Sequence, residues 1–335
     1  MIGTGNWLAR TWRQRGLAAC LLWPLSLLYG WATGFHRWLY RVGLLKTERF
    51  AVPVIVVGNV VVGGAGKTPL VIALAKHLMQ QGLKVGVVSR GYGRHEKKCL
   101  EVVDDTPISQ SGDEPALIFK ALRAPVFVAN KRSEAIHALL AKFPETQLVI
   151  SDDGLQHHRL AGDIRITVFD DRGVGNGWLL PAGPLRERFS IARQDLVLHT
   201  GRTPAFGGYI SNRRLADHAV AVDGTLVHLR DLKHQPLTAL AGIANPVAFF
   251  DMLRAQGLVL TQTIALPDHF DFSEYRFPEQ TSNMVLCTEK DAVKLFKIHS
   301  ATNAGVLAVP LEFTPEPALL TAVDDLLAPL LYKTS

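Results

Sequence analysis

Residues 52–82 read VPVIVVGNVVVGGAGKTPLVIALAKHLMQQG, and this stretch decides the fold of the chain. It begins with an almost unbroken apolar run of strand length at 52–59. A glycine-rich turn follows, and apolar residues with helical spacing begin after Thr68, with Gly82 placed to end the helix. A strand, a glycine-rich turn and a helix in this order are typical of a phosphate-binding loop.

The turn matches only the second half of the usual phosphate-loop pattern, G-x-x-x-x-G-K-[ST]. Residues 66–68 supply Gly-Lys-Thr, but Val61 stands where the first glycine belongs. Such loops wrap phosphates with backbone N–H groups, while the lysine contacts the β- and γ-phosphates and the hydroxyl holds Mg²⁺. A turn with a solvated lysine would explain the glycines but not Lys-Thr at a helix start, so we predict a nucleotide site. The predicted nucleotide-binding residues are Gly63, Gly64, Ala65, Gly66, Lys67, Thr68 and Pro69.

A second apolar run, QLVISDDG (147–154), ends in two carboxylates, Asp152 and Asp153. A phosphate loop needs an acidic residue at the end of a neighbouring strand to organise Mg²⁺. The competing interpretation is a simple turn, because Asp-Gly is a common turn pair. With a phosphate loop upstream we predict a Mg²⁺ site, and the sequence leaves open which of the two carboxylates faces the ion.

Further short apolar runs alternate with helical stretches such as DEPALIFKALR (113–123). Unbroken apolar runs suit strands that are covered on both faces, and such strands form parallel sheets. The alternation therefore predicts a doubly wound α/β fold. The runs are 84–89, 125–129, 147–151 and 164–170.

A polar, irregular stretch at 200–235 precedes a second series of strand and helix patterns. We therefore predict an α/β chain with three parts. A membrane-associating hydrophobic helical segment occupies 1–45, a P-loop NTPase-like domain with a mostly parallel sheet occupies 46–204, and a smaller α/β domain occupies 205–335. The cleft between the two domains is the expected active site.

The positive charge of the chain is concentrated at its N-terminus. Residues 1–49 hold seven basic residues and one acidic residue, which accounts for the whole net charge of +6. The same segment holds five of the six tryptophans. A nucleic-acid-binding surface would spread Lys and Arg over the folded body, so we expect no nucleic-acid partner. The three cysteines lie far apart, which fits a reducing compartment rather than a disulfide framework.

The same segment contains a run of uncharged residues at 16–35. As a helix this run would extend about 30 Å, enough to cross a bilayer core. Pro24 is expected to kink the helix, and arginines flank both ends, so the charges indicate no orientation. A signal peptide is the competing interpretation, but no small-x-small cleavage site follows. We predict membrane association, and leave open whether the helix spans the bilayer or lies in the interface.

Transfer of a phosphoryl group also needs a group that accepts the proton of the attacking hydroxyl. GDEP (112–115) contains two carboxylates, but it is also a common helix start. A lone histidine, as in PDHF (267–270), is more often a capping or surface residue than a catalyst. Residue chemistry therefore leaves the choice open. The candidates are Asp113, Glu114, Asp153, His157, His158 and His269.

Several motifs in a fixed order carry a family resemblance. They are VGNVVVGGAGKTP (57–69), SRGYGR (89–94), GDEP (112–115), SDDGLQHH (151–158), GNGWLLPAGPLRE (175–187), AGIANP (241–246), PDHF (267–270) and TEKD (288–291). Together they resemble the tetraacyldisaccharide 4′-kinases, the lipid A 4′-kinases of Gram-negative bacteria. The resemblance covers essentially the whole chain. The loop of that family also lacks the first glycine, so Val61 agrees with it.

The resemblance implies a specific reaction and place. Members of the family transfer the γ-phosphoryl group of ATP, with Mg²⁺, to the 4′-hydroxyl of an acylated glucosamine disaccharide 1-phosphate lipid, which forms lipid IVA. They act at the cytoplasmic face of the inner membrane. We therefore expect ATP, Mg²⁺, the lipid and the membrane surface as partners, the last through residues 1–45, and no protein partner.

The resemblance also implies roles for individual residues. Lys67, Asp113 and His269 are the implied catalytic residues, with Asp113 and His269 expected in different domains, so that closure would bring them together. The implied metal ligands are Thr68, Asp152, Asp153 and Glu114. The implied substrate-binding residues are Asn59, Tyr92, Arg94, Gln156 and His157.

Two other classes of protein remain as alternatives. A membrane-attached GTPase switch would carry Asn-Lys-x-Asp to read guanine, but residues 130–133 read Asn-Lys-Arg-Ser. A soluble small-molecule kinase or ligase would carry its hydrophobic N-terminus incidentally. Comparison of ATP with GTP, and of chains with and without residues 1–45, distinguishes these classes from a lipid kinase.

Overall fold

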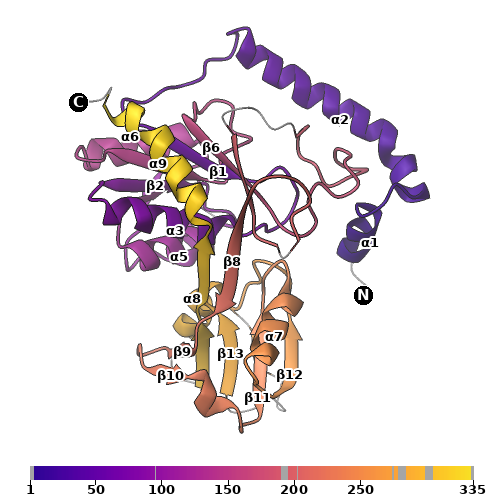
Figure 1. The fold of residues 1–335 in the computed structure, drawn as a ribbon, viewed down its shortest axis with the longest axis vertical. Coiled ribbons are helices and arrows are strands. Elements are labelled where there is room, and N and C mark those ends of the chain that lie inside the picture. Colours follow the sequence, from indigo (N-terminus) through magenta and orange to yellow (C-terminus); the bar gives the residue numbers. More distant parts are fainter. Residues whose placement is uncertain are drawn as a thin grey trace. The chain divides into compact units, whose positions relative to one another are not determined.

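The computed structural model describes residues 4–94, 96–189, 195–201, 203–273, 275–277, 284–298 and 305–332. The chain forms two compact units (Figure 1). Unit 1 comprises Met1–Arg90, Ala124–Asn212 and Pro315–Ser335, and unit 2 comprises Gly91–Arg123 and Arg213–Thr314. The units interleave along the chain, whereas we expected consecutive segments. Residues 91–123 belong with the C-terminal half because helix α5 (Asp113–Leu122) packs on helix α8 (Glu289–Ile298).

A sheet of parallel strands forms the centre of unit 1. Seven strands in the part of the chain that the structure describes follow one another in the order β8-β7-β6-β1-β5-β2-β4. The pairings of β1 with β5 and β6, of β2 with β4 and β5, and of β7 with β6 and β8 are parallel, as predicted. The strands are β1 (Val54–Gly58), β2 (Val85–Ser89), β4 (Val126–Val128), β5 (Leu148–Asp152), β6 (Ile164–Phe169), β7 (Asp195–His199) and β8 (Tyr209–Leu215), the last of which continues into unit 2.

Helices cover both faces of this sheet. Helix α6 (Arg132–Lys142) packs against the face that carries Val54 and Val56 of β1. Side chains alternate along a strand, so the intervening residues of β1 face the other side, where α3 (Lys67–Gln80) packs. Helix α9 (Pro317–Leu331) lies beside α3, since Nε2 of His77 is 2.9 Å from Oδ2 of Asp324. The predicted doubly wound architecture is confirmed.

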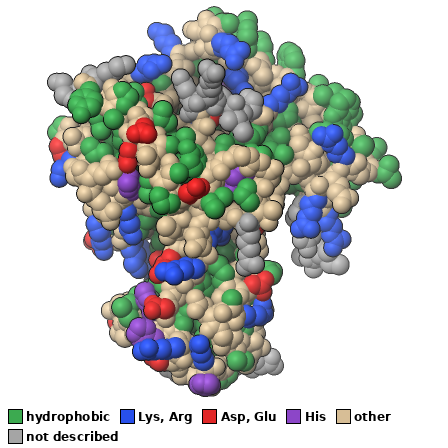
Figure 2. Space-filling model, viewed as in Figure 1, with side chains coloured by type: hydrophobic (Ala, Val, Ile, Leu, Met, Phe, Trp, Pro, Cys, Tyr) green, Lys and Arg blue, Asp and Glu red, His purple; other side chains and the backbone are tan. Residues whose placement is uncertain are grey.

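The N-terminal part of unit 1 consists of α1 (Thr4–Thr11) and the long helix α2 (Leu17–Arg41). Helix α2 continues through Pro24 instead of ending there. By length and composition it could cross a membrane, with a mean hydropathy of 1.3 in its most apolar window. Apolar side chains gather along it (Figure 2), and Leu17, Leu21 and Trp31 are all more than two-thirds exposed.

Unit 2 contains a second, smaller sheet, with the order β10-β9-β14-β13-β11-β12. Strands β12, β11, β13 and β14 are parallel, and β9 and β10 are antiparallel. Its strands are β9 (His218–Ala221), β10 (Leu226–His228), β11 (Leu237–Ala241), β12 (Leu260–Ala265), β13 (Met284–Thr288) and β14 (Gly305–Val309). Two further short strands are β3 (Leu100–Glu101) and β15 (Leu311–Pro315), and the other helical turns are α4 (Ile108–Ser111) and η1 (Leu229–Leu232).

The sheet of unit 2 is also covered on both faces. Helix α7 (Pro246–Ala255) contributes Phe249, Phe250 and Leu253 to one core cluster. Helix α8 contributes Ala292 and Leu295 to a second cluster on the other face. The C-terminal region is therefore an α/β unit, as predicted from its sequence pattern.

Candidate active site

The glycine-rich turn connects β1 to α3, and its backbone needs glycine at two places. Gly66, at the N-terminus of α3, has φ of 81°, and Gly63 has φ of 100°. Both angles lie in the left-handed region that side chains disfavour. Lys67 is the first residue of α3, and its Nζ lies 3.2 Å from Oδ1 of Asn59 and 3.2 Å from Oδ1 of Asp153. The lysine is thus held at the helix N-terminus, where a phosphate would bind.

Asn59 shapes the loop from inside. Its side chain is fully buried, and its Nδ2 donates to the carbonyl oxygens of Val61 at 2.7 Å and Gly63 at 2.9 Å. Its Oδ1 accepts the bond from Lys67, so both polar atoms of the amide are engaged within the loop. Through these contacts Asn59 connects parts of the phosphate loop, and its expected role in substrate binding stays a prediction.

Val61 fills a structural position that a glycine would leave empty. Its side chain is 3% exposed and packs in a cluster with Phe169 and Leu185. Its backbone forms an antiparallel bridge with Leu185, and the N–H of Val62 donates to the carbonyl of Pro184 at 2.9 Å. The first half of this loop is therefore an extended, paired segment, which explains why the usual first glycine is absent.

Two side chains fix the peptide planes of the second half of the loop. The guanidinium of Arg172 donates to the carbonyls of Val62 at 2.9 Å and Gly64 at 3.1 Å, and Thr200 Oγ1 donates to the carbonyl of Ala65 at 2.9 Å. In a trans peptide the next N–H points away from the carbonyl, so these bonds direct the following N–H groups to the opposite side. The sequence motif gave no signal for Arg172 or Thr200.

The paired aspartates lie beside the loop in the sheet. Asp152 ends β5, opposite Val57 of β1, and accepts a bond from Ser89 Oγ at 3.3 Å. Asp153 follows with φ of 51°, and its carboxylate contacts Lys67 and, at 3.6 Å, Arg186. Burial alone would raise the pKa of Asp153, but these two cations lower it below its usual value, so the carboxylate is ionised at neutral pH.

Arg132, the first residue of α6, holds the backbone of the aspartate pair. Its side chain is buried, and Nη2 donates to the carbonyl of Asp152 at 3.2 Å and to that of Asp153 at 2.9 Å. Burial and the nearby guanidinium of Arg132 lower the pKa of His157 to about 4, so this imidazole is neutral at pH 7. Gln156 donates from Nε2 to the carbonyl of Asn59 at 2.9 Å, which ties the SDDGLQHH motif to the loop.

A second cluster of functional side chains lies in unit 2. Asp113 begins α5, and its Oδ2 is 3.1 Å from Nδ1 of His269 and 3.0 Å from Nζ of Lys294. Burial alone would raise the pKa of Asp113, but the hydrogen bond from His269 and the charge of Lys294 lower it well below its usual range. His269 has φ of 61°, and its ring lies 4.8 Å from that of Tyr92.

The structure corrects one expectation about this pair. Asp113 and His269 both belong to unit 2, because residues 91–123 join the C-terminal half. Their hydrogen bond therefore forms within one unit and does not depend on closure of two domains. Arg94 lies in the same unit, where its guanidinium donates to the carbonyls of Lys97 and Lys98.

Comparisons with known proteins give the family. The sequence profile described as tetraacyldisaccharide-1-P 4′-kinase matches residues 18–328. The chain belongs to this family. It is 62% identical to the tetraacyldisaccharide 4′-kinase of Polaromonas naphthalenivorans (strain CJ2) over 97% of this chain and 96% of the relative. It is 51% identical to that of Acidovorax sp. (strain JS42), over 95% and 94%.

A solved member of the family has the same fold. The crystal structure of LpxK from Aquifex aeolicus in complex with ATP matches with a TM-score of 0.76 and 29% identity, over 93% of this chain and all of that chain. The predicted P-loop kinase-like fold and the predicted membership of the tetraacyldisaccharide 4′-kinase family are confirmed, and the chain is a kinase.

Two lysines of this kinase were not predicted as site residues. Lys290, in the TEKD motif, places Nζ 3.3 Å from Nε2 of His269, 3.0 Å from Asp268 and 3.5 Å from Glu114. Burial alone would lower the pKa of Lys290, but the two carboxylates raise it above its ordinary value. Lys294 lies one helical turn later on α8 and contacts Asp113. The sequence signal that could have revealed them is their spacing of four residues, which places both lysines on the same face of a helix.

Replacing Lys290 with Met is expected to lower kcat about tenfold, since two partly buried ion pairs and a donor to the imidazole are lost together. Lys297 serves as the matched control, because it lies exposed on the same helix and its Nζ bonds to the backbone carbonyl of Thr106 at 3.5 Å. Initial rates of both variants at saturating substrates measure the effect. Equal rates for the two variants would contradict a role of Lys290 at His269.

Proposed function

We propose that this kinase transfers the γ-phosphoryl group of ATP to the 4′-hydroxyl of tetraacyldisaccharide 1-phosphate, with formation of lipid IVA. Two grounds support this reaction: the chain belongs to the family, and the structure has the elements of a phosphate-binding site. Lys67 is the first residue of α3 and follows a loop whose left-handed glycines and hydrogen-bonded carbonyls match a phosphate-binding loop. Its ammonium contacts the carboxylate of Asp153, which directly follows β5.

In the proposed reaction, unit 1 binds the nucleotide. The loop residues 63–69 surround the phosphates with backbone N–H groups, and the ammonium of Lys67 stabilises negative charge on the transferred group. Arg172 and Thr200 keep the loop in this form without rearrangement, since their bonds to its carbonyls are already made. A preorganised site stabilises the transition state more than one that must reorganise.

We also propose Mg²⁺ as the metal. The hydroxyl of Thr68 and the carboxylates of Asp152 and Asp153 are oxygen donors of the kind that Mg²⁺ prefers. All three residues lie in unit 1, where Thr68 follows Lys67 in α3 and Asp153 contacts the ammonium of Lys67. These residues would hold the ion, which would neutralise charge on the phosphates. Glu114 remains a proposed further ligand from unit 2, where its carboxylate now faces the cation of Lys290.

Asp113 is the proposed acceptor of the proton from the 4′-hydroxyl. Its carboxylate is ionised at neutral pH, and Lys290 donates toward Nε2 of His269, which leaves the Nδ1 proton of the ring for Asp113. His269 therefore fixes one carboxylate oxygen and leaves the other for the substrate. The hydroxyl proton moves to that oxygen as the bond to phosphorus forms.

Helix α2 is the proposed contact with the membrane, at the cytoplasmic face of the inner membrane. An acylated substrate cannot leave the bilayer easily, because exposure of each CH₂ group costs about 0.8 kcal/mol. The exposed leucines and tryptophans of α2, flanked by arginines, suit the membrane interface.

Incubation of the purified chain with tetraacyldisaccharide 1-phosphate and ATP tests the proposal. We expect a bisphosphorylated product by mass spectrometry, loss of product with EDTA, and much slower turnover with GTP. Recovery of only unreacted lipid from folded protein with Mg²⁺ would contradict the proposed function. Turnover with GTP equal to that with ATP would instead favour the nucleotide-switch alternative.

A further inference from the structure

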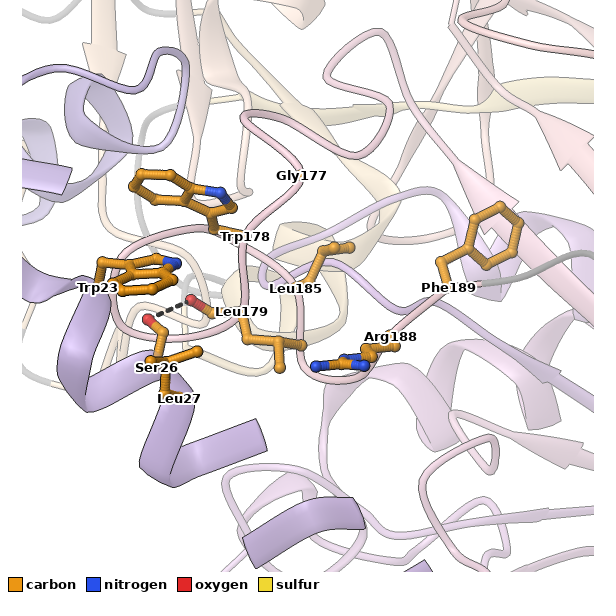
Figure 3. A pocket seen from close by; sticks show the side chains of 9 residues that line it. All are labelled: Trp23, Ser26, Leu27, Gly177, Trp178, Leu179, Leu185, Arg188 and Phe189. Carbon is orange, nitrogen blue, oxygen red and sulfur yellow. Dashed lines mark hydrogen bonds between the residues drawn. The ribbon is translucent and has the colours of Figure 1, made fainter. Parts of the chain in front are cut away.

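The segment of residues 176–187, called here the connecting segment, lies between α2 and the phosphate loop. On the side of α2, Ser26 Oγ donates to the carbonyl of Leu179 at 2.8 Å and accepts from the N–H of Ala182 at 2.9 Å. Tyr29 Oη donates to the carbonyl of Arg186 at 2.8 Å. Trp23 and Leu27 of α2 line a pocket of about 320 Å³ together with Trp178 and Leu179 of the connecting segment (Figure 3).

The opposite side of the connecting segment is bonded to the phosphate loop. The N–H of Arg186 donates to the carbonyl of Val60 at 2.8 Å, and the carbonyl of Pro184 accepts from Val62 at 2.9 Å. Leu185 packs with Val61 in the same core cluster. The segment therefore contacts the hydrophobic helix on one side and the nucleotide loop on the other.

A chain of polar side chains runs along the same path. Arg37 of α2 places Nη2 2.7 Å from Oε2 of Glu187. The other oxygen of Glu187 accepts from Nε2 of Gln156 at 2.9 Å, and the same Nε2 donates to the carbonyl of Asn59. Asn59 in turn holds Lys67 through its Oδ1.

Arg37 is important for this chain of contacts because its partner Glu187 is largely buried. The side chain of Glu187 is only 14% exposed, whereas that of Arg37 is 40% exposed and remains in contact with solvent. A carboxylate that loses its cation in such a place must draw in water or another cation. Either change competes with its bond from Gln156, and Gln156 then holds Asn59 less firmly.

We propose that Arg37 is a positioning residue for the nucleotide loop, so that the hydrophobic helix α2 tunes ATP binding as well as carrying the chain to the membrane. This inference rests on the proposed function. Arg37 touches no loop residue itself and acts through Glu187, Gln156 and Asn59. A change in how α2 packs against the connecting segment therefore changes the affinity of the loop for ATP.

ATP affinity of the full-length protein in detergent micelles tests this inference, because no bilayer is present. We expect Arg37→Gln to weaken ATP binding about three- to fivefold in titration calorimetry, a modest effect because Arg37 is partly solvated. Arg41→Gln is the matched control, since it removes the same charge from the same helix one turn later. Its ATP affinity is expected to equal that of the unchanged chain.

Binding to anionic phosphatidylglycerol vesicles completes the comparison. Both variants are expected to lose vesicle affinity equally, since each removes one basic residue. Glu187→Gln tests the route: if Arg37 acts through Glu187, adding Arg37→Gln to it should weaken ATP binding less than about twofold further. Should Arg37→Gln unfold, Arg37→Lys keeps the charge with a shorter reach and is expected to give a smaller loss.

The possible failures are distinct. If the unchanged chain binds no ATP, the proposed function is wrong and this inference falls with it. If the unchanged chain binds ATP and Arg37→Gln binds it equally well, the inference alone is wrong, and Arg37 serves only membrane attachment. Equal losses of ATP affinity in Arg37→Gln and Arg41→Gln would also overturn it, because the effect would then follow charge and not the contact with Glu187.

Discussion

Replacement of Asp113 with Asn is expected to lower kcat about 10²- to 10⁴-fold, the range typical for loss of a general base. Asn keeps the size of the side chain and can still accept a bond from Nδ1 of His269, but it cannot take a proton from the sugar hydroxyl. Because Asp113 is not among the residues proposed to bind the nucleotide, ATP affinity should change little. Initial rates and ATP titration measure the two effects separately.

Asp105→Asn is a suitable control for this variant, because Asp105 is an exposed carboxylate of the same unit. It should leave kcat unchanged. A kcat of Asp113→Asn within about tenfold of the unchanged chain, with folding intact by circular dichroism, would show that another group accepts the proton. His269→Gln is expected to have a smaller effect, since in the proposed mechanism His269 only orients the carboxylate.

The lowered pKa of Asp113 bears on both catalysis and stability. A strongly acidic carboxylate is a weak base, but in phosphoryl transfer the bond to the leaving group breaks early, so the hydroxyl proton can move late. For stability, a carboxylate with a lowered folded-state pKa contributes above the pKa of an unfolded aspartate. This contribution is lost as the pH falls through the folded-state pKa. Asp113→Asn should therefore have a lower free energy of unfolding than the unchanged chain at neutral pH, and this difference should shrink as the pH falls.

The sequence predicted best those elements whose signal lies within one continuous stretch of residues. The strand, turn and helix of residues 52–82, and the apolar runs that became β2, β4, β5 and β6, were predictable because each is a continuous pattern. The resemblance located Asp113 and His269, and the structure brings them within hydrogen-bond distance. Helix α6 was not predicted, since its apolar residues form only a weak stripe.

Side chains that act on backbone groups from distant parts of the chain could not be predicted. Arg132 and Arg172 are ordinary arginines in the sequence, and only folding shows that their guanidinium groups bind carbonyls of the aspartate pair and of the loop. The interleaving of the units was hidden for the same reason. Packing of α5 on α8 joins residues far apart in sequence, and no local pattern reports such a contact.

Lys67→Met is expected to reduce kcat/KM about 10³-fold or more, because one cation serves the phosphates and the loop together. Met matches the length of the side chain but carries no charge, so the ammonium proposed to stabilise the transferred phosphoryl group is lost. The partly buried carboxylate of Asp153 also loses its 3.2 Å partner, while Arg186 remains at 3.6 Å. Asn59 loses the donor to its Oδ1, which loosens the loop that it organises.

Lys76→Met on the same helix controls for loss of charge, since Lys76 is exposed on α3. It should leave kcat/KM unchanged. Lys67→Arg separates charge from geometry: the guanidinium keeps the charge, but its larger planar group does not fit between Asn59 and Asp153 at 3.2 Å from each. If Arg restored most of the activity, charge alone would suffice at this position. We expect little recovery, because the loop holds an ammonium at one point, and that point is set by the two side chains that face it.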